Sequence, residues 1–422
     1  MKRQYQPLIQ EYLSYFPCVA LIGARQTGKS TLIQMVANNR ESFDLEARVD
    51  YDQIARDPDF FLRSKQAPIA IDEAQLIPEL FPALRVAIDR NRSVAGQYLL
   101  SGPSSPELLS AIAESLAGRI GIIEIAPFSF SETREVDTPN LLSLFQENFS
   151  AQDIFSFSLP AAEHAPQLQH VNDYWFYGGY PEPWLKEEGR FREVWREQYL
   201  KTYIERDVAK LFPNLNSVRF RRFIELLAGC SGSIINYSNI ANLLDVSQPT
   251  VKDYFKIAHG TFMWRNLPPY TKNVTKRIVK HPRGYFRDTG LLHHILQIAS
   301  HQRLQSHPQM GASWEGFVIE EILRSLNAAG INYIHYYYRT SGGAEIDLVV
   351  EGKFGLIPFE IKHTQSVALK QLKAIKDFIV EFNCPFGIVV NNDEKVRQYD
   401  ENLYGIPLSL LTASTSNAKK QK

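Results

Sequence analysis

The chain has 422 residues, of which 44% are hydrophobic and 22% charged, a composition typical of a globular protein with two or three domains. Its 46 basic and 46 acidic residues cancel, which excludes a global field that would draw the chain to nucleic acid. Three widely separated cysteines exclude a zinc knuckle or a disulfide framework and suit a reducing compartment. The basic N-terminus is not followed by an apolar segment, and no apolar run of about 18 residues occurs. We therefore expect no signal peptide, no membrane span and a cytoplasmic location.

The first motif in chain order is a phosphate-binding loop of the pattern G-x-x-x-x-G-K-[ST]. Its positions are Gly23, Ala24, Arg25, Gln26, Thr27, Gly28, Lys29, Ser30 and Thr31. The apolar run 19–22 predicts a buried strand before the loop, and 29–37 lacks Gly and Pro, which predicts a helix after it. Backbone N–H groups of such a loop point at phosphate oxygens, Lys29 would reach the β- and γ-phosphates, and Ser30 would ligate Mg²⁺. The sequence thus predicts a site for ATP and Mg²⁺.

A pair of carboxylates follows the next apolar strand. The run 68–71 ends in Asp72 and Glu73, about 40 residues after the phosphate-binding loop. In this place Asp72 would hold Mg²⁺ in its second coordination shell or through water, and Glu73 would polarise the attacking water. Many strands end in Asp-Glu without such a role, so the interpretation depends on the loop that precedes them.

Two further polar residues are candidates for the same site. Leu80, Leu84 and Ile88 share a helix face, and the strand 97–100 ends at Ser101, which could sense the γ-phosphate or simply end the strand. Arg119 follows a glycine and could act as an arginine finger in cis or from a neighbouring subunit, or be a solvated surface arginine.

These motifs occur in an order that resembles the bacterial and archaeal AAA+-type ATPases with a C-terminal DUF4143 region. The resemblance is carried by GARQTGKST (23–31), AIDEAQ (70–75), LLSGPSS (99–105), ESLAGRI (114–120), PFSFSE (127–132), GGYPE (178–182), YLKTYIERDV (199–208) and YFRDTGL (285–291). One departure is Pro103, where the family usually has small polar residues, and it puts the sensor role of Ser101 in doubt. Residues 135–172 match poorly and are predicted to be a variable insertion.

The middle of the chain contains a helical connector and a helix-turn-helix pattern. In the connector, Tyr203, Arg206 and Asp207 could pass on the nucleotide state or form a structural salt-bridged helix. Ser238 is predicted to cap one helix and Ser247 the next. On the second helix the predicted buried residues are Val251, Tyr254 and Phe255, and the predicted outward residues are Gln248, Thr250, Lys252 and Asp253.

Residues 265–287 carry seven Lys or Arg residues and no acid, which we call the basic stripe. A basic stripe beside a helix-turn-helix indicates contact with double-stranded DNA. The alternative is that the winged helix binds a protein, because such modules often do.

The last part of the chain holds a second constellation of charged residues. Glu315 lies in an amphipathic helix over 313–323, and Asp347 in an alternating strand over 344–350. A turn at 352–355 leads to Glu360 and Lys362, which period-2 spacing places on one strand face. Asp347 and Glu360 could bind a divalent metal, and Lys362 could orient water or neutralise the phosphate.

This second constellation resembles the PD-(D/E)XK nuclease fold, with 369–382 as its following helix. Three accounts stay open from the sequence: DNA cleavage, a binding module without cleavage, and a metal-free salt bridge of Lys362 with Asp347 or Glu360.

The combined hypothesis is an α/β protein with a P-loop NTPase parallel sheet, an α-helical/winged-helix domain and an α/β restriction-endonuclease-like domain. The expected divisions are 1–132 (ATPase), 133–212 (insertion and connector), 213–295 (winged helix), 296–412 (DUF4143, nuclease-like) and 413–422 (disordered tail). The expected activity is Mg²⁺-dependent ATP hydrolysis coupled to the DNA-binding and nuclease-like parts. The alternatives are an ATP-gated DNA- or protein-binding regulator and an ATP-switched nuclease, as a homo-oligomer or with an unknown protein partner.

Overall fold

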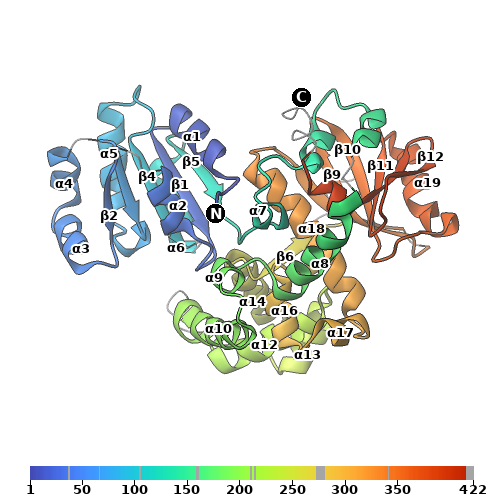
Figure 1. Cartoon of the computed structure of the whole chain (residues 1–422). Helices are drawn as coiled ribbons and strands as arrows, with labels where there is room; N and C mark the ends of the chain where they lie inside the picture. Colours follow the sequence, from blue (N-terminus) through green and yellow to red (C-terminus); the bar gives the residue numbers. More distant parts are fainter. Residues whose placement is uncertain are drawn as a thin grey trace.

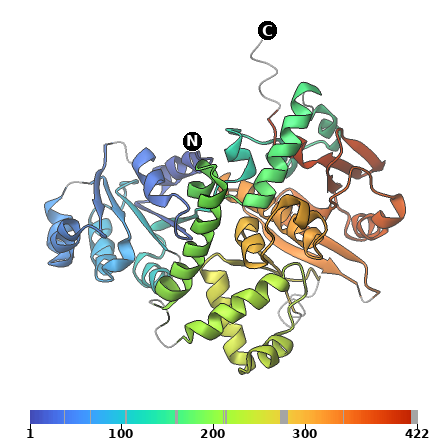
Figure 2. The ribbon, with the colours of Figure 1, turned by 60° about the horizontal axis from the view of Figure 1, so that its bottom comes forward.

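The computed structural model describes residues 1–422 apart from 37–38, 66, 104–105, 158–160, 210–211, 213–214, 272–280, 341 and 415–422. Three bodies are visible in Figure 1, which we call the N-terminal domain (1–127, blue to teal), the middle domain (178–305, green to yellow) and the C-terminal domain (310–414, orange to red). Figure 2 shows the molecule from below, where green helices lie between the blue and the orange parts.

The N-terminal domain is a five-stranded parallel sheet in the order β2-β3-β4-β1-β5. Its strands are β1 (Cys18–Gly23), β2 (Glu41–Asp44), β3 (Ile69–Asp72), β4 (Tyr98–Pro103) and β5 (Ile120–Glu124). Its helices are α1 (Gln6–Tyr15), α2 (Lys29–Val36), α3 (Arg48–Ala55), α4 (Pro58–Ser64), η1 (Ala74–Leu76), α5 (Leu80–Arg90) and α6 (Pro106–Leu116). The expected P-loop NTPase sheet is confirmed.

The central strand β1 explains why this sheet has helices on both faces. All six of its residues are buried, because alternate side chains enter two different cores. Cys18 and Ala20 pack in the core that includes residues of α3, α4, α5 and α6, and Val19 and Leu21 pack in the core that includes residues of α1 and α2. The phosphate-binding loop therefore leaves the middle of a rigid sheet.

The middle domain is helical and contains the predicted helix-turn-helix. Its elements are α9 (Pro181–Leu185), α10 (Gly189–Thr202), the π-helical turn η4 (Tyr203–Val208), α12 (Ser217–Gly229), α13 (Tyr237–Leu244), α14 (Gln248–Gly260), β6 (Trp264–Leu267), β7 (Arg283–Phe286), α16 (Thr289–Ile295) and α17 (His301–Gln305). Ser247 caps α14 by accepting from the N–H of Thr250, as predicted. The predicted cap at Ser238 is wrong, because the Asn236 side chain accepts from the N–H of Asn239 and starts α13 earlier. The antiparallel pair β6–β7 forms the wing.

The C-terminal domain is a mixed six-stranded sheet in the order β12-β13-β11-β10-β9-β8. Its elements are α18 (Met310–Ala328), β8 (Ile334–Arg339), β9 (Glu345–Gly352), β10 (Gly355–Ile361), η5 (Leu369–Leu372), α19 (Lys373–Phe382), β11 (Gly387–Asn391), β12 (Arg397–Asp400), β13 (Leu403–Pro407) and α20 (Leu408–Leu411). The hairpin β9–β10 is antiparallel and β10–β11 is parallel. Helices α18 and α19 pack in separate hydrophobic cores with side chains of this sheet.

The segment between the N-terminal and middle domains belongs to the C-terminal core. It contains α7 (Phe130–Thr133), η2 (Asn140–Phe145), η3 (Ala151–Ser156) and α8 (Ala161–Tyr177). Phe145 stacks on Phe359 of β10 with ring centroids 6.0 Å apart, and the Asn140 side chain donates to the Leu410 carbonyl. The chain thus crosses from the first domain to the last before it builds the middle one.

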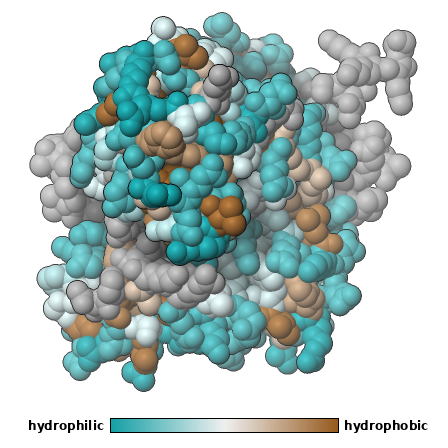
Figure 3. All heavy atoms as spheres, turned by 90° about the vertical axis from the view of Figure 1, so that its left-hand side faces the viewer, coloured by the Kyte–Doolittle hydropathy of each residue, from teal (hydrophilic) through white to brown (hydrophobic). Residues whose placement is uncertain are grey.

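Figure 3 shows the outer face of the N-terminal domain, where hydrophilic residues dominate and apolar residues form small separate spots. Exposed apolar side chains of this domain include Met35, Val49 and Phe60. In the described part of the chain, no helix is long and apolar enough to cross a membrane.

Candidate functional site

The phosphate-binding loop connects β1 to α2, as predicted. Gln26 and Gly28 adopt left-handed backbone conformations with φ of +60° and +88°, which fold the loop tightly between strand and helix. The Lys29 ammonium is buried and donates to the carbonyls of Gly23 at 3.1 Å and Ala24 at 2.8 Å. Ser30 is exposed at the first turn of α2, where a hydroxyl can meet a metal ion.

The charge on Lys29 is not fully compensated by its surroundings. Burial lowers the pKa of Lys29 to about 8, although Glu73 and Asp72 act in the opposite direction. A bound anion would stabilise the charged form of this lysine, because a nearby negative charge favours the protonated ammonium. The position therefore suits a lysine that binds phosphate.

The two carboxylates follow β3 at the same edge of the sheet. Glu73 has a left-handed backbone with φ of +54°, and its N–H donates to Asp72 Oδ1 at 3.0 Å. Ser101, on the adjacent β4, donates from its hydroxyl to the same Asp72 oxygen. The structure thus brings Asp72, Glu73 and Ser101 together beside the loop, and the Ser101 hydroxyl fixes the Asp72 carboxylate.

Gln75 is a site residue that the sequence analysis missed. Its side-chain amide donates to Glu73 Oε2 at 2.5 Å, while its own carbonyl oxygen is buried with no partner among the described residues. Burial raises the pKa of the Glu73 carboxyl, and the bond from Gln75 opposes that rise. The sequence did contain a clue, since Gln75 is the last residue of the AIDEAQ motif. Spacing alone could not show that the Gln75 side chain points back to Glu73.

Arg3 is a second residue that the sequence analysis missed, and its side chain holds the phosphate-binding loop by a hydrogen bond to the Thr27 carbonyl. Its guanidinium is buried and donates to the Thr27 carbonyl at 2.7 Å, the Ala126 carbonyl at 2.7 Å and Glu132 Oε1 at 2.9 Å. The phosphate-binding loop is therefore bonded, through one side chain, to the PFSFSE segment.

Arg119 lies at the wrong end of the sheet for a finger in cis. Its neighbour Ile120 pairs with Cys18 at the start of β1, whereas the loop begins after Gly23, about 15 Å further along the strand. The Arg119 guanidinium makes a bidentate ion pair with Asp89, at 2.8 Å for each bond. The role in cis is thus contradicted by the geometry, and a role in trans stays a prediction.

Two segments quoted for the family resemblance, GGYPE (178–182) and YFRDTGL (285–291), meet at the junction of the domains. Asp288 accepts from the N–H of Gly179 at 2.9 Å and caps α16. Arg287 donates to Glu124, at the carboxyl end of β5, at 2.5 Å and to Glu320 of α18 at 3.3 Å. Burial alone would raise the pKa of Glu124, but Arg287 outweighs it and holds that pKa below its usual value. Arg287 of the middle domain therefore links the carboxyl end of β5, at the edge of the sheet that carries the loop, to α18 of the C-terminal domain.

The second constellation also assembles, at the hairpin β9–β10 and on α18. Lys362 Nζ lies 2.6 Å from Glu360 Oε1 and 3.9 Å from Asp347 Oδ2. Asp347 Oδ2 also accepts from the N–H of Ile361 at 2.9 Å. Burial, and then Asp347, raise the pKa of Glu315 to about 8 and that of Glu360 to about 7. All four predicted residues thus share one cluster, which we call the carboxylate cluster (Glu315, Asp347, Glu360 and Lys362).

Two residues from the wing complete this cluster. The Tyr285 hydroxyl donates to Glu315 Oε2 at 3.1 Å, and Arg283 contacts Asp347 at 3.5 Å and Glu345 at 3.1 Å. Within the described residues, no group of three or more His, Cys, Asp or Glu side chains could hold a metal ion. The arrangement matches the salt-bridge account more closely than the prediction of a metal site at Asp347 and Glu360.

The basic stripe is not a continuous exposed surface. Arg265 and Arg287 are buried in ion pairs with Glu320, and Arg283 faces the carboxylate cluster, so the prediction that these arginines contact DNA is wrong. The remaining basic residues, including Lys276 and Arg277, lie in 272–280, outside the described residues. On α14, Gln248, Lys252 and Asp253 are exposed as predicted, and Val251, Tyr254 and Phe255 are buried.

The connector prediction is only partly visible. Tyr203 is buried, and its hydroxyl bonds to that of Thr261 before the wing. The side chains of Arg206 and Asp207 lie outside the described residues.

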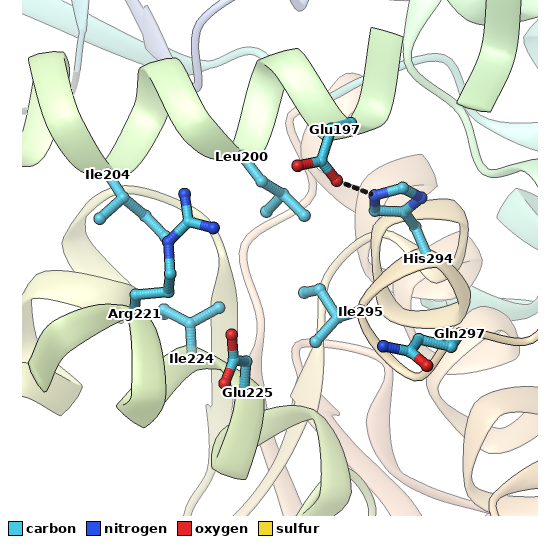
Figure 4. Close-up of a pocket in the computed structure, with 9 residues that line it drawn as sticks. All are labelled: Glu197, Leu200, Ile204, Arg221, Ile224, Glu225, His294, Ile295 and Gln297. Carbon is cyan, nitrogen blue, oxygen red and sulfur yellow. Dashed lines mark hydrogen bonds and ion pairs between the residues drawn. The ribbon is translucent and has the colours of Figure 1, made fainter. Parts of the chain in front are cut away.

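The middle domain also contains a cavity of about 420 Å³ between α10, α12 and α16 (Figure 4). Leu200, Ile204, Ile224 and Ile295 form its apolar part. The His294 side chain meets Glu197 at 3.2 Å across the rim. Leu200 and Ile204 belong to the quoted YLKTYIERDV segment (199–208), but the sequence analysis predicted no cavity here.

Three family descriptions match this chain. Residues 15–134 match the family described as AAA domain, and 310–411 match DUF4143, a domain of unknown function. Residues 168–302 match DUF8612, also a domain of unknown function. The three matches follow the order of the N-terminal, middle and C-terminal domains.

Similar proteins include two mycobacterial relatives, which match this chain over the same number of residues. The uncharacterized protein Rv2008c of Mycobacterium tuberculosis and its counterpart Mb2031c of Mycobacterium bovis are each 33% identical over 372 residues, covering 88% of this chain and 76% of the relative. The uncharacterized protein MJ1544 of Methanocaldococcus jannaschii is 26% identical over 184 residues, 42% of this chain and 38% of that protein.

Among solved structures, the Walker-type ATPase PABY2304 of Pyrococcus abyssi is 16% identical, with a TM-score of 0.39 over 70% of this chain and 95% of that one. This likeness is too loose to add to the strand order described above. The mycobacterial relatives and the AAA and DUF4143 matches carry the assignment. The chain belongs to the family of AAA-type P-loop ATPases that carry a C-terminal DUF4143 region.

Proposed function

We propose that this protein binds Mg²⁺-ATP at the phosphate-binding loop and hydrolyses it to ADP and phosphate. The observation that carries the proposal is the convergence of Lys29, Asp72, Glu73 and Ser101 at one edge of the sheet, from three neighbouring strands. These residues come from separate motifs, and a chance loop pattern would not bring them together.

Each residue has a role that its contacts support. Lys29, released from the Gly23 and Ala24 carbonyls, would bind the β- and γ-phosphates together with the loop N–H groups. The Ser30 hydroxyl and the Asp72 carboxylate are hard oxygen donors, which suit Mg²⁺. Bound Mg²⁺ would neutralise phosphate charge. Glu73, oriented by Gln75, would accept the proton of the attacking water.

Steady-state ATP hydrolysis by the purified chain tests the proposal. Glu73→Gln should keep ATP binding and lower turnover by about 10²–10⁴-fold, because it removes the base but not the phosphate contacts. Lys29→Ala serves as the blank. If the unmodified protein turns over ATP no faster than the blank, the proposal of ATP hydrolysis is rejected. If Glu73→Gln keeps full turnover, the role of Glu73 is rejected.

A second candidate function is nucleotide-regulated binding of double-stranded DNA by the helix-turn-helix. The exposed face of α14 with Gln248 and Lys252 favours it, whereas the buried Arg265 and Arg287 remove part of its expected basic surface. Duplex binding should weaken steeply with salt and fall in Lys276 and Arg277 substitutions. Stimulation of ATP hydrolysis by duplex DNA would join both functions, and the absence of stimulation would favour a protein partner.

A further inference from the structure

Arg3 lies in the N-terminal segment before α1 and packs against the phosphate-binding loop. The residue is 3% exposed, and its Nη1 donates to the carbonyl of the buried Thr27 at 2.7 Å. The position that a Cβ atom of Gly28 would take lies 3.4 Å from the same nitrogen. The guanidinium is therefore in direct contact with the turn that the loop makes at Gly28.

The bond to Thr27 fixes the direction of one backbone N–H group of the loop. Thr27 and Gly28 share a trans peptide, in which the carbonyl and the N–H point in opposite directions. Since Arg3 holds the Thr27 carbonyl on one side, the Gly28 N–H points to the other side, away from Arg3. A charged donor also polarises the peptide that it binds. In a phosphate-binding loop such N–H groups meet phosphate oxygens, so Arg3 can act on a bound nucleotide through the backbone.

A second set of contacts joins Arg3 to the C-terminal domain. Its Nε donates to Glu132 Oε1 at 2.9 Å, and Glu132 is the third residue of the short helix α7. The N–H groups of Phe130 and Ser131, at the start of α7, donate to the Glu321 carboxylate of α18 at 2.7 Å and 3.1 Å. A continuous path of hydrogen-bonded groups therefore runs from the loop, through one helical turn, to α18.

The charged groups of this path are buried, so breaking a single link is strongly unfavourable. Glu132 is bound on both oxygens, by Arg3 and the Gln4 N–H on one and by the Ser129 N–H on the other. Burial raises the pKa of Glu321, and the N–H groups of α7 oppose that rise because they bind its charged form. A fully bonded buried network of this kind keeps one arrangement and moves as a unit.

We propose that Arg3 is a positioning residue for nucleotide binding and that, through Glu132 and α7, it makes the affinity for ATP depend on the docking of α18. An occupied loop and a docked α18 then stabilise each other, because the coupling between two sites acts equally in both directions. The inference rests on the proposed binding of ATP, and it assigns the regulation of that site to the C-terminal domain.

Calorimetric titration of the full chain with ATP tests the role of Arg3. Arg3→Gln should weaken ATP binding by at least about tenfold, because the Thr27 carbonyl loses its charged donor. The KM for ATP should rise by a similar factor while kcat changes by less than about threefold, since the bond to the loop is the same in the ground state and the transition state.

The same titration tests the link to α18. Glu321→Gln should weaken ATP binding by about threefold or more, although Glu321 belongs to another domain. The loss in the double variant of Arg3→Gln and Glu321→Gln should be smaller than the product of the two separate losses, because both changes break one network.

Arg192→Gln is the matched control. Arg192 of α10 is 8% exposed and, like Arg3, donates to backbone carbonyls, those of Pro183 at 2.8 Å and Trp184 at 3.4 Å. Its loss should lower stability to urea but leave ATP binding unchanged. Arg3→Met keeps an unbranched side chain against the Phe128 ring and replaces Arg3→Gln if the latter fails to fold, as judged by circular dichroism.

The outcomes separate this inference from the proposed function. An unmodified chain that binds no ATP would reject both. If the unmodified chain binds ATP, unchanged affinity in a folded Arg3 variant would overturn the inference alone, and so would an equal loss in Arg192→Gln, which would show a general effect of lost stability. Losses in Arg3→Gln and Glu321→Gln that simply multiply would overturn the link through α7.

Discussion

The two charged sites of this protein use the same residue types in opposite ways. In each, a lysine and two carboxylates gather at the ends of neighbouring strands. At the phosphate-binding loop, Lys29 donates to backbone carbonyls, and burial lowers its pKa to about 8. In the carboxylate cluster, burial would lower the pKa of Lys362, but Asp347 and Glu360 outweigh it and raise that pKa. The first lysine is available for an anionic ligand, and the second is already neutralised by its own chain.

The comparison shows that a triplet of Asp, Glu and Lys does not specify its ligand. The difference arises from what surrounds each lysine. A loop of backbone groups surrounds Lys29, and a wing arginine competes beside Lys362 for the same carboxylate. The first arrangement favours phosphate, and the second favours internal ion pairing.

Exchanging the two lysines for alanine gives the largest expected contrast. Lys29→Ala should abolish ATP binding. Lys362→Ala should leave ATP binding unchanged and destabilise the fold by about 1–3 kcal/mol, because Glu360 and Asp347 lose a hydrogen-bonding partner. Calorimetric titration with ATP and urea unfolding measure the two effects. Equal loss of ATP binding in both variants would show that the sites are not distinct in function.

The carboxylate cluster should give the next largest effect, in the pH dependence of stability. Burial, and then Asp347, raise the pKa of Glu360 from 4.5 to about 7. The folded chain then binds this proton more tightly than the unfolded chain, so this group makes stability fall as the pH rises from 4.5 to about 7. Glu360→Gln should remove that loss, so its stability relative to the unmodified protein should rise with pH by about 1–3 kcal/mol.

Urea unfolding at about pH 5 and about pH 8 measures this change, with Glu381→Gln on the exposed part of α19 as the control. A difference that is the same at both pH values would contradict the pKa shift as the cause.

Gln75→Ala tests the site near the loop more finely. The Gln75 bond lowers the pKa of Glu73, so its loss should raise that pKa and move the acid limb of the pH–rate profile to higher pH. Turnover at neutral pH should fall about tenfold, with ATP binding unchanged, because one hydrogen bond to the base is lost. A uniform drop in rate at every pH would argue for a purely structural effect.

Arg119→Ala should have the smallest effect, since Arg119 belongs to neither cluster. Its surface pair with Asp89 contributes little to stability because solvent screens it, and hydrolysis by a single chain should stay within about twofold of the unmodified rate. Rates measured over a range of protein concentrations check this. A strong loss that depends on concentration would instead establish Arg119 as a finger in trans.

The sequence predicted best what is local. The loop motif located Lys29 and Ser30. The predicted strand ends located Asp72, Glu73 and Ser101, because the carboxyl ends of neighbouring parallel strands meet at the same edge of the sheet. The hairpin spacing likewise placed Asp347 opposite Glu360. A cap was misplaced by two residues, since Asn236 and Ser238 are both good caps and only packing selects between them.

What the sequence could not reveal depends on contacts between distant segments. Arg3 bonds to Thr27, and Arg283, assigned to the basic stripe, bonds to a strand of another domain. A basic residue in a sequence reads as a surface charge, because its partner is not visible until the chain folds. The sequence therefore predicted an exposed basic surface where Arg265 and Arg287 are in fact buried in ion pairs. Arg283 likewise contacts Asp347 of the C-terminal domain.

The crossing of the segment 128–177 to the C-terminal core has a consequence for the order of synthesis. The N-terminal sheet is complete once β5 has left the ribosome, but Phe145 must wait for Phe359, more than 200 residues later. At elongation rates of about 5–20 residues per second this delay is roughly 10–40 s. During that time the nascent chain carries an apolar segment without its partner, so this stretch is where chaperones would act on the emerging protein.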